Sequence, residues 1–600
     1  MKHAILFRRI VTSTLLFAIV FSLCFAWYYA TSIGLGDDNL RYDAVGLAAA
    51  AAAAVLPVIL YRCTLRVVSL LPGIFIALSW IITGPYVSYA TFAASGIIYL
   101  NNMYDIYIGL YLFGLTLCTY MLFRRFSNDK TAALVTSILQ IIELMIPIIQ
   151  WIYYALYSSC ITTSGALIMY QTNISETGEY LHSLGIFHVV GIILMLLICL
   201  TTFFFVETKT LPIPKNNWGK LSVPIFALLI IIPSAYVMAE SIVPESFPIR
   251  LFLDTHDYLQ QSSLYATNHA EKYKALQVVQ KNPAHSPNTV IVVIGESETR
   301  TLMNAYDPKH VQNTPWLTGE KSNPNFTLFT NVYSCAWYTV PVLEHALTES
   351  NFYNTKQFNQ STSIIDIAKK LGYKTYWFSN QGSIGIADTP ITLVANTADV
   401  AKWTDKDNKE SRYDESLLDF LKQVNPNENN FIVLHLMGSH IEYRNRYPKS
   451  FHKFDDGTLN EQADFDNTVL YTDLILSQIY QYAHDNLHLD AMVYFSDHGS
   501  DPMVRRQPDP TGFTVLRIPM FCYLSNQYEQ RNPDVVRTLK HNQNAFFTND
   551  LLYELVCGIL NIKSPNYDES YSLASPKWKM KRKDLVTRFG ETSLMDDTAF

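Results

Sequence analysis

The sequence predicts an N-terminal polytopic α-helical membrane domain followed by an α/β/α domain with a mostly parallel central sheet. Residues 1–238 are almost continuously apolar, with charges confined to short gaps. Charged residues make up 16% of the chain, against about 25% in soluble proteins, and the shortfall lies in this first part. From Thr289 onward, short β-rich runs alternate with amphipathic helical patterns, which is typical of a sheet covered on both faces.

Seven apolar runs are long enough to cross a hydrocarbon core of roughly 30 Å. Basic residues such as Arg62 and Lys130 occupy alternate gaps, and acidic residues such as Asp38 and Glu179 occupy the others. By the positive-inside rule, the N-terminus is cytoplasmic and everything after Met238 lies on the outer side. A cleaved signal peptide, the alternative for the first run, is typically shorter and followed by a small-x-small site. The runs are Ile10–Tyr28, Val45–Leu60, Val67–Val87, Ile106–Phe123, Ala132–Tyr154, Ile186–Val206 and Leu221–Met238.

The predicted organisation therefore has three parts. Residues 1–238 form a membrane domain of about seven helices, residues 239–287 form a polar, proline-punctuated linker near the bilayer, and residues 288–600 form an outer soluble domain. The predicted strands of that domain are Thr289–Ile294, Lys374–Phe378, Asn430–His435, Ala491–Phe495 and Ile518–Tyr523. Its predicted helices include Ile364–Leu371, Tyr413–Gln423 and Asp466–Asp485.

Polar side chains follow three of these strands at the point where each strand ends. Glu296 follows the first, His440 follows the third, and Asp497 with His498 follows the fourth. Ligands of such sheets bind at the carboxyl ends of the strands, so the four side chains are expected to converge. Oxygen and imidazole ligands without thiolate fit zinc, or manganese in a carboxylate-rich site. Taken singly, Asp-His-Gly also fits an ordinary loop, and Glu296 also fits an acid at a helix N-terminus.

A candidate nucleophile lies between residues 331 and 343, where an apparent strand turns into a helical run at Pro341. A hydroxyl at a helix N-terminus beside a metal ion is activated for attack, since both favour negative charge. Thr339 is the first choice. Ser334 competes with it, and so does a plain N-cap role for Thr339.

The charge and cysteine content of the chain limit the classes of partner and the disulfide bonds that it is expected to have. The formal net charge is −7 and no Lys/Arg block forms a basic arm, which excludes a nucleic-acid partner. Outside the membrane part the cysteines are only Cys335, Cys522 and Cys557. This odd, scattered set is no disulfide framework; buried thiols are expected, with a single bridge as the alternative.

These motifs, in order along the soluble domain, resemble the bacterial phosphoethanolamine transferases of the alkaline phosphatase superfamily, which modify lipid A or the lipopolysaccharide core. The chain looks closer to core- or glucan-modifying members, because Ser334-Cys335 is followed by Ala336-Trp337 and the threonine comes later. The motifs are Val293-Ile-Gly-Glu-Ser-Glu-Thr-Arg300, Asn313-Thr-Pro315, Thr339-Val-Pro-Val-Leu-x-x-Ala-Leu-Thr348, Trp377-Phe-Ser-Asn-Gln381, His435-Leu-Met-Gly-Ser-His440, Arg446-Tyr-Pro448, Asp466-Asn-Thr468 and Ser496-Asp-His-Gly499.

The resemblance implies a soluble domain of alkaline phosphatase/sulfatase type that acts as a zinc-dependent periplasmic enzyme of a multi-pass inner-membrane protein. Zinc, with Mn²⁺ or Mg²⁺ as alternatives, would be held by Glu296, Thr339, Asp497 and His498, and Thr339 would carry the phosphoethanolamine. His440 would bind the phosphate group or a second metal and assist proton transfer. A histidine that relatives carry soon after Asp-His-Gly is missing here, so Arg505, or Arg506 as the alternative, is expected to supply the positive charge.

The resemblance also implies phosphatidylethanolamine as donor and lipopolysaccharide or a periplasmic glucan as acceptor. Thr172 and Glu176 would contact the donor head group, since a carboxylate suits an ammonium; a solvated loop is the alternative. In the fifth span, Gln140, Glu143 and Gln150 share one helical face, which predicts interhelical hydrogen bonds or a lipid-entry groove.

Three other functions compete with this prediction. A phosphoglycerol transferase, or another phosphodiesterase or hydrolase of the superfamily, would use similar residues. A sulfatase is disfavoured, because Cys335 is not followed by the Pro/Ala-x-Arg pattern that its modification needs. A non-catalytic membrane receptor would need no tightly bound metal.

Overall fold

The computed structural model of the chain describes residues 2–61, 70–92, 100–157, 186–209, 247–283, 286–381, 390–404, 413–454, 460–503 and 512–599, with a few short pieces between 160 and 239. The described residues divide into two compact units, one up to His256 and one from Asp257 onward. Each unit has its own buried core.

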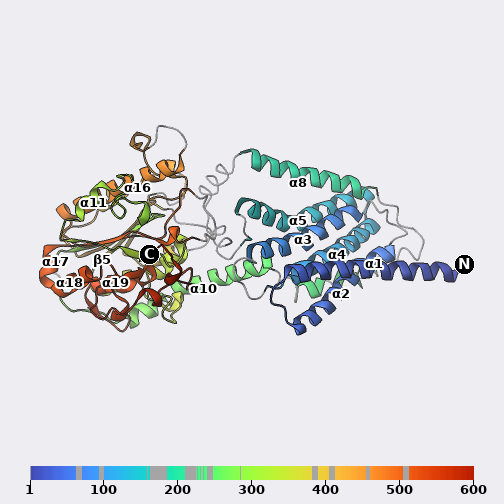
Figure 1. Cartoon of the computed structure of the whole chain (residues 1–600), viewed down its shortest axis with the longest axis horizontal. Coiled ribbons are helices and arrows are strands. Elements are labelled where there is room, and N and C mark those ends of the chain that lie inside the picture. Colours follow the sequence, from blue (N-terminus) through green and yellow to red (C-terminus); the bar gives the residue numbers. More distant parts are fainter. Residues whose placement is uncertain are drawn as a thin grey trace. The chain divides into compact units, whose positions relative to one another are not determined.

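Six helices of the first unit are long and apolar enough to cross a membrane, counted over the described residues. They correspond to the first six predicted spans and form a polytopic membrane domain (Figure 1). The seventh prediction, Leu221–Met238, is described only in short pieces and is not among these six helices. The helices are α1 (Lys2–Thr31), α2 (Asp37–Tyr61), α3 (Leu71–Phe92), α4 (Met103–Phe126), α5 (Asp129–Tyr157) and α8 (Ile186–Glu207).

Helix α4 is the most enclosed of these, and it packs against α2, α3 and α5. Gly109 permits a close approach to α3, because a Cβ there would lie 2.7 Å from the carbonyl oxygen of Ala77. Polar side chains of α5 bond to neighbouring helices: Gln140 Nε2 donates to Glu207 Oε1 at 2.9 Å, and Thr116 Oγ1 lies 2.7 Å from Glu143 Oε1. The interhelical hydrogen bonds predicted for Gln140 and Glu143 are thus present.

A long helix, α10 (Phe247–Ala275), occupies much of the segment predicted as a linker. Its C-terminal part packs on the soluble domain. The ring of Tyr265 stacks on Phe358 with centroids 4.4 Å apart, and His269 Nε2 lies 2.7 Å from Asp366 Oδ1. The second unit accordingly begins inside this helix.

The soluble domain is built on a seven-stranded sheet in the order β3-β9-β8-β2-β7-β5-β6. Strands β8, β2, β7, β5 and β6 run parallel, whereas β9 pairs antiparallel with both β8 and β3. The predicted, mostly parallel sheet is confirmed, with an antiparallel edge. The strands are β2 (Thr289–Gly295), β3 (Phe326–Leu328), β5 (Lys374–Ser379), β6 (Val400–Trp403), β7 (Asn430–His435), β8 (Leu489–Ser496) and β9 (Met520–Leu524).

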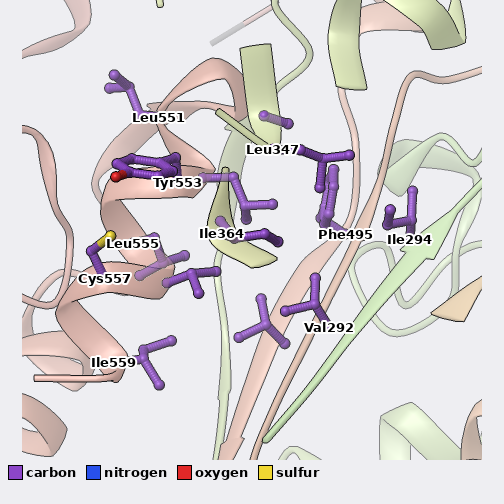
Figure 2. Close-up of a cluster of buried hydrophobic side chains, with 14 of the residues drawn as sticks. Val292, Ile294, Leu347, Ile364, Phe495, Leu551, Tyr553, Leu555, Cys557 and Ile559 are labelled. Atoms are coloured by element: carbon purple, nitrogen blue, oxygen red, sulfur yellow. The ribbon is translucent and has the colours of Figure 1, made fainter. Parts of the chain in front are cut away.

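Both faces of the sheet are buried, which explains why its strands read as continuous apolar runs. In β2, Val292 and Ile294 enter one core and Ile291 and Val293 enter the other, because successive side chains alternate between faces. Figure 2 shows the first core, where Val292 and Ile294 lie near Phe495 of β8, with Leu555 and Ile559 of α19 on its far side.

Helices cover the two faces, and smaller strand pairs complete the domain. In Figure 1, α11 and α16 lie on one side of the sheet and α18 and α19 on the other. The helices are α11 (Pro315–Glu320), α12 (Thr339–Ala346), α13 (Ile364–Lys370), α14 (Pro390–Ala395), α15 (Ser416–Leu421), α16 (Glu461–Asn486), α17 (Asn526–Arg531), α18 (Pro533–His541) and α19 (Leu552–Ile559). The small pairs join β1 (Val279–Gln280) to β11 (Ile562–Lys563), β4 (Asn331–Tyr333) to β10 (Phe546–Thr548), and β12 (Val586–Thr587) to β13 (Thr592–Ser593).

Candidate metal centre and nucleophile

Glu296, Asp497 and His498 form a group able to hold a metal ion, with one ligand atom of each within 4.8 Å of the others. The sheet brings them together. Strands β2 and β8 are parallel neighbours in which Gly295 pairs with Ser496, so the residue after each strand emerges at the same edge. All three side chains are buried. The predicted convergence of these strand ends is therefore observed.

The electrostatics of this group fit a cation. Burial, reinforced by the neighbouring Glu296 carboxylate, raises the pKa of Asp497 well above its ordinary value. His498 Nδ1 faces the Gly499 carbonyl oxygen at 2.9 Å, and because that oxygen only accepts, Nδ1 carries the proton. His498 Nε2 is then a lone-pair donor, 3.5 Å from both Glu296 Oε1 and Asp497 Oδ2. Two carboxylates and an imidazole nitrogen in a buried space are a donor set that suits a divalent metal.

Thr339 lies beside this group. It is the first residue of α12, and its Oγ1 donates to Glu296 Oε2 at 3.0 Å. The N-cap of the helix is Tyr338, with no side-chain cap, so Thr339 does not serve as the cap. Ser334 is fully buried and donates to the Asp497 carbonyl oxygen at 2.6 Å, whereas Thr339 is half-buried. The geometry therefore favours Thr339 over Ser334 as the hydroxyl available for chemistry.

Two amide side chains that the sequence did not single out hold the centre. Gln381 Nε2 donates to Glu296 Oε2 at 2.8 Å and to the Leu436 carbonyl oxygen at 2.9 Å. Asn549 Nδ2 donates to the Asp497 carbonyl oxygen at 2.7 Å, and its Oδ1 accepts from the Cys335 backbone N–H at 2.9 Å. Gln381 lies just after β5, so the strand-end argument applied to the second predicted strand points to it.

The backbone around Glu296 is tightly constrained. Ser297 has φ +59°, which is unusual for a residue with a side chain, and its Oγ donates to Glu296 Oε1 at 2.6 Å. Gly438 has φ +46°, and a Cβ there would lie 2.8 Å from the Glu296 carbonyl oxygen. Only glycine fits this approach. The Glu296 carboxylate is thereby fixed from several directions before any ligand arrives.

His440 lies in the loop after β7. The Ser439 backbone N–H in this loop donates to the Glu296 carbonyl oxygen at 2.9 Å, which places the loop against the centre. Among the described residues, the metal-binding group itself contains Glu296, Asp497 and His498 and not His440. Thr172, Glu176 and Arg505 lie outside the described residues.

The three cysteines of the soluble domain are free and buried, as the sequence analysis expected. Burial raises the pKa of the Cys335 thiol well above its ordinary value, although Cys335 lies on the loop between β4 and Thr339. A protonated, enclosed thiol is a poor nucleophile, so Cys335 is a packing residue.

The comparisons with known proteins agree with this site. Residues 288–556 match the family model described as Sulfatase. The matched region lies within the soluble part of the chain, and the match fits the alkaline phosphatase superfamily expected from the motifs.

Several relatives extend over the membrane part. The chain is 25% identical over 508 residues to phosphoethanolamine transferase EptC of Escherichia coli (strain K12), covering 76% of this chain and 86% of that protein. It is 34% identical over 218 residues to phosphoethanolamine transferase OpgE of the same strain, covering 35% of this chain and 39% of that protein. The resemblance to proteins named phosphoethanolamine transferases is confirmed.

A solved structure shares the fold over most of the chain. The integral membrane protein lipooligosaccharide phosphoethanolamine transferase A from Neisseria meningitidis aligns with a TM-score of 0.55 at 18% identity, covering 84% of this chain and 98% of that one. An alignment of this extent includes both membrane helices and the soluble domain. The predicted fold class is thereby confirmed.

Proposed function

We propose that this chain is an enzyme that transfers phosphoethanolamine from phosphatidylethanolamine to a lipopolysaccharide or glucan acceptor through a covalent intermediate on Thr339. The relatives named phosphoethanolamine transferases support the reaction class. The observation that carries the choice of nucleophile is the Thr339 hydroxyl, which begins α12 and donates to Glu296 within the metal-ligand group.

Glu296, Asp497 and His498 would hold zinc, with Thr339 as the fourth protein ligand. When bound, zinc supplies positive charge that lowers the pKa of a hydroxyl and polarises a phosphoryl oxygen. The chain's own residues do the positioning: Gln381 and Ser297 orient the Glu296 carboxylate, and the first turn of α12 favours negative charge beside Thr339.

The proposed reaction has two displacements at one phosphorus atom. In the first, Thr339 Oγ1 forms a bond to the phosphorus and the bond to the diacylglycerol oxygen breaks. The threonine loses a proton and diacylglycerol gains one. In the second, an acceptor oxygen bonds to the phosphorus, the bond to Thr339 breaks, and the threonine regains a proton that the acceptor loses. His440, in the loop beside Glu296, would bind the phosphate group or carry these protons.

The membrane domain supports the choice of a lipid donor. The six apolar helices, together with the integral membrane relative, support a multi-pass protein of the inner membrane with its soluble domain in the periplasm. Phosphatidylethanolamine and envelope acceptors are both available there. Thr172 and Glu176 remain the predicted contacts of the ethanolamine head group.

The covalent intermediate is tested by the mass of the intact protein. After incubation of the purified, zinc-loaded full chain with phosphatidylethanolamine, we expect one phosphoethanolamine adduct per chain, located on Thr339. Thr339→Ala should bear no adduct, because the attacking oxygen is absent. Thr330→Ala is the matched control, since Thr330 is exposed and its hydroxyl contacts only Asn544 in the described structure.

Two outcomes would contradict the proposal. An adduct on the Thr339→Ala protein would place the nucleophile elsewhere. An adduct formed from labelled phosphatidylglycerol, with none from labelled phosphatidylethanolamine, would make the enzyme a phosphoglycerol transferase.

A further inference from the structure

A hairpin far along the chain holds the loop that carries Thr339. Thr587 Oγ1 donates to the Ser334 carbonyl oxygen at 2.6 Å, across 253 positions of sequence. The Phe589 backbone N–H donates to the Cys335 carbonyl oxygen at 3.0 Å. The β12–β13 hairpin is therefore part of the wall beside the nucleophile.

Trp337 lies on the accessible side of this wall, next to Thr339. Tyr338, between them, is extended with φ −149° and ψ 154°. In an extended segment, alternate side chains point to the same side. The burial pattern agrees, because Tyr338 is buried while Trp337 and Thr339 are each half-buried. The side chains of Trp337 and Thr339 therefore emerge on the same side of this segment.

Arg588 lies over this indole. Its guanidinium carbon is 5.4 Å from the centre of the Trp337 ring, within the range of a cation–π contact. Its Nη2 donates to the Gly512 carbonyl oxygen at 2.8 Å, and the Phe589 ring meets Trp337 edge-on with centroids 4.8 Å apart. The guanidinium is therefore held in place and still only partly buried.

The backbone that presents Arg588 is strained. Arg588 and Phe589 have φ values of +52° and +58°, both in the left-handed region that side chains disfavour. Consecutive residues of this kind persist only where the surroundings hold them, and they concentrate at functional sites. Here the strain fixes the Arg588 side chain above Trp337.

We propose that Trp337 and Arg588 form the cationic wall of the acceptor pocket at Thr339, and that Arg588 binds a phosphate or carboxylate group of the acceptor. The inference rests on the proposed transferase function and names one of its specificity-determining residues. Arginine suits this role because its planar fork binds such groups with two parallel hydrogen bonds. The acceptor is the more fitting source of the anion, because the donor head group ends in an ammonium, which a guanidinium repels.

The test separates the two half-reactions in the full-length enzyme. Adduct formation on Thr339 from phosphatidylethanolamine alone reports donor use. Transfer from the adduct to lipopolysaccharide with intact core phosphates, compared with the same lipopolysaccharide after dephosphorylation, reports acceptor use. For Arg588→Gln, adduct formation should keep its wild-type rate, while KM for the phosphorylated acceptor rises about tenfold to a hundredfold. The preference for phosphorylated over dephosphorylated acceptor should disappear, and Arg588→Lys should retain part of it.

Arg582→Gln is the matched control. Arg582 also lies over an aromatic ring, with its guanidinium carbon 5.0 Å from the centre of Phe546, but it is not on the wall beside Thr339. The Arg582→Gln enzyme should have the wild-type KM for the acceptor and the wild-type preference for phosphorylated over dephosphorylated lipopolysaccharide.

Each result decides the inference. Unchanged acceptor KM and preference in Arg588→Gln, with normal adduct in the wild type, would overturn it while leaving the proposed function intact. An equal slowing of adduct formation would assign Arg588 to the donor phosphate and overturn the acceptor role. Absence of any wild-type adduct would instead contradict the proposed function. If Arg588→Gln fails to fold, the graded preference of Arg588→Lys decides.

Discussion

Carboxyl groups enclosed by protein occur in both units of the molecule, and their surroundings differ between the two units. In the membrane domain, Glu207 accepts a hydrogen bond from Gln140, and Glu143 accepts one from Thr116, so each acid has a donor on another helix. In the soluble domain, Glu296 and Asp497 also accept hydrogen bonds, but the two carboxyl groups lie beside each other, with His498 Nε2 3.5 Å from an oxygen of each. The membrane acids make contacts between helices, whereas the soluble pair with His498 is a donor set that suits a cation.

The comparison shows how the surroundings of a buried acid reveal its use. Where hydrogen-bond donors on a neighbouring helix offset the free-energy cost of burying a carboxyl group, the contact stabilises helix association and requires no ligand. Where two neighbouring carboxyl groups increase each other's free-energy cost of burial, a bound cation would offset that cost. The comparison therefore predicts a ligand-binding role for the soluble cluster and a role in helix association for the membrane contacts.

The largest effect is expected from Asp497→Asn. Zinc binding should be lost, and phosphoethanolamine transfer should fall by about a thousandfold or more, because the metal supplies several kcal/mol of charge stabilisation. In the metal-free protein, however, Asp497→Asn should raise the melting temperature, because an amide replaces a carboxyl group whose ionisation is opposed by burial and by the neighbouring Glu296. With zinc present, the wild type should have the higher melting temperature. Metal content and thermal unfolding of both proteins, with and without zinc, measure this.

Asp534→Asn is the control for that experiment, since Asp534 is exposed on α18. It should change neither the bound zinc nor the order of the melting temperatures. Equal zinc binding by the wild type and Asp497→Asn would contradict the assignment of a metal-binding role to the soluble cluster.

A smaller effect is expected from Gln381→Ala. The substitution removes the amide that orients Glu296, and loss of such a partner of a ligand typically lowers metal affinity about tenfold to a hundredfold. Zinc titration against a competing chelator gives the affinity directly. Gln423→Ala, at an exposed position just after α15, should leave the zinc affinity unchanged. An unaltered affinity in Gln381→Ala would show that the contacts from Ser297 and Thr339 are enough to orient the carboxylate.

The smallest effect is expected in the membrane domain. Thr116→Val removes the hydroxyl that donates to Glu143 and should destabilise the helix bundle by about 1 kcal/mol, the usual size of such interhelical bonds. Bound zinc should stay at the wild-type amount. Unfolding of the detergent-solubilised protein measures the change. Thr201→Val is the control, because the Thr201 hydroxyl bonds to its own helix at Leu197. A loss of zinc in Thr116→Val would contradict the separation of the two roles.

The sequence predicted the centre of the soluble domain well because two signals agreed there. The strands that became β2, β5, β7 and β8 are apolar runs of the right length, and Glu296, Asp497 and His498 follow two of them directly. The short strands β3 and β6 were missed. With three and four residues, they lack the apolar run that marks a central strand.

The supporting contacts of the site were harder to predict. Asn549 reaches the Asp497 backbone across 52 positions, and Thr587 reaches Ser334 across 253. Single amides and hydroxyls in loops have no periodicity, so nothing in their local sequence signals such a partner. The positive φ of Ser297 was equally hidden, because serine is not a residue that ordinarily marks a left-handed position.

The β12–β13 hairpin has a consequence for the timing of synthesis. The loop before Thr339 is held by Thr587 and Phe589, which the ribosome adds roughly 250 residues later. An emerging chain that already contains its metal ligands up to His498 still lacks this support. The complete support of the Thr339 loop can therefore form only after residues 587–589 have been synthesised, so the finished site is a late product of folding.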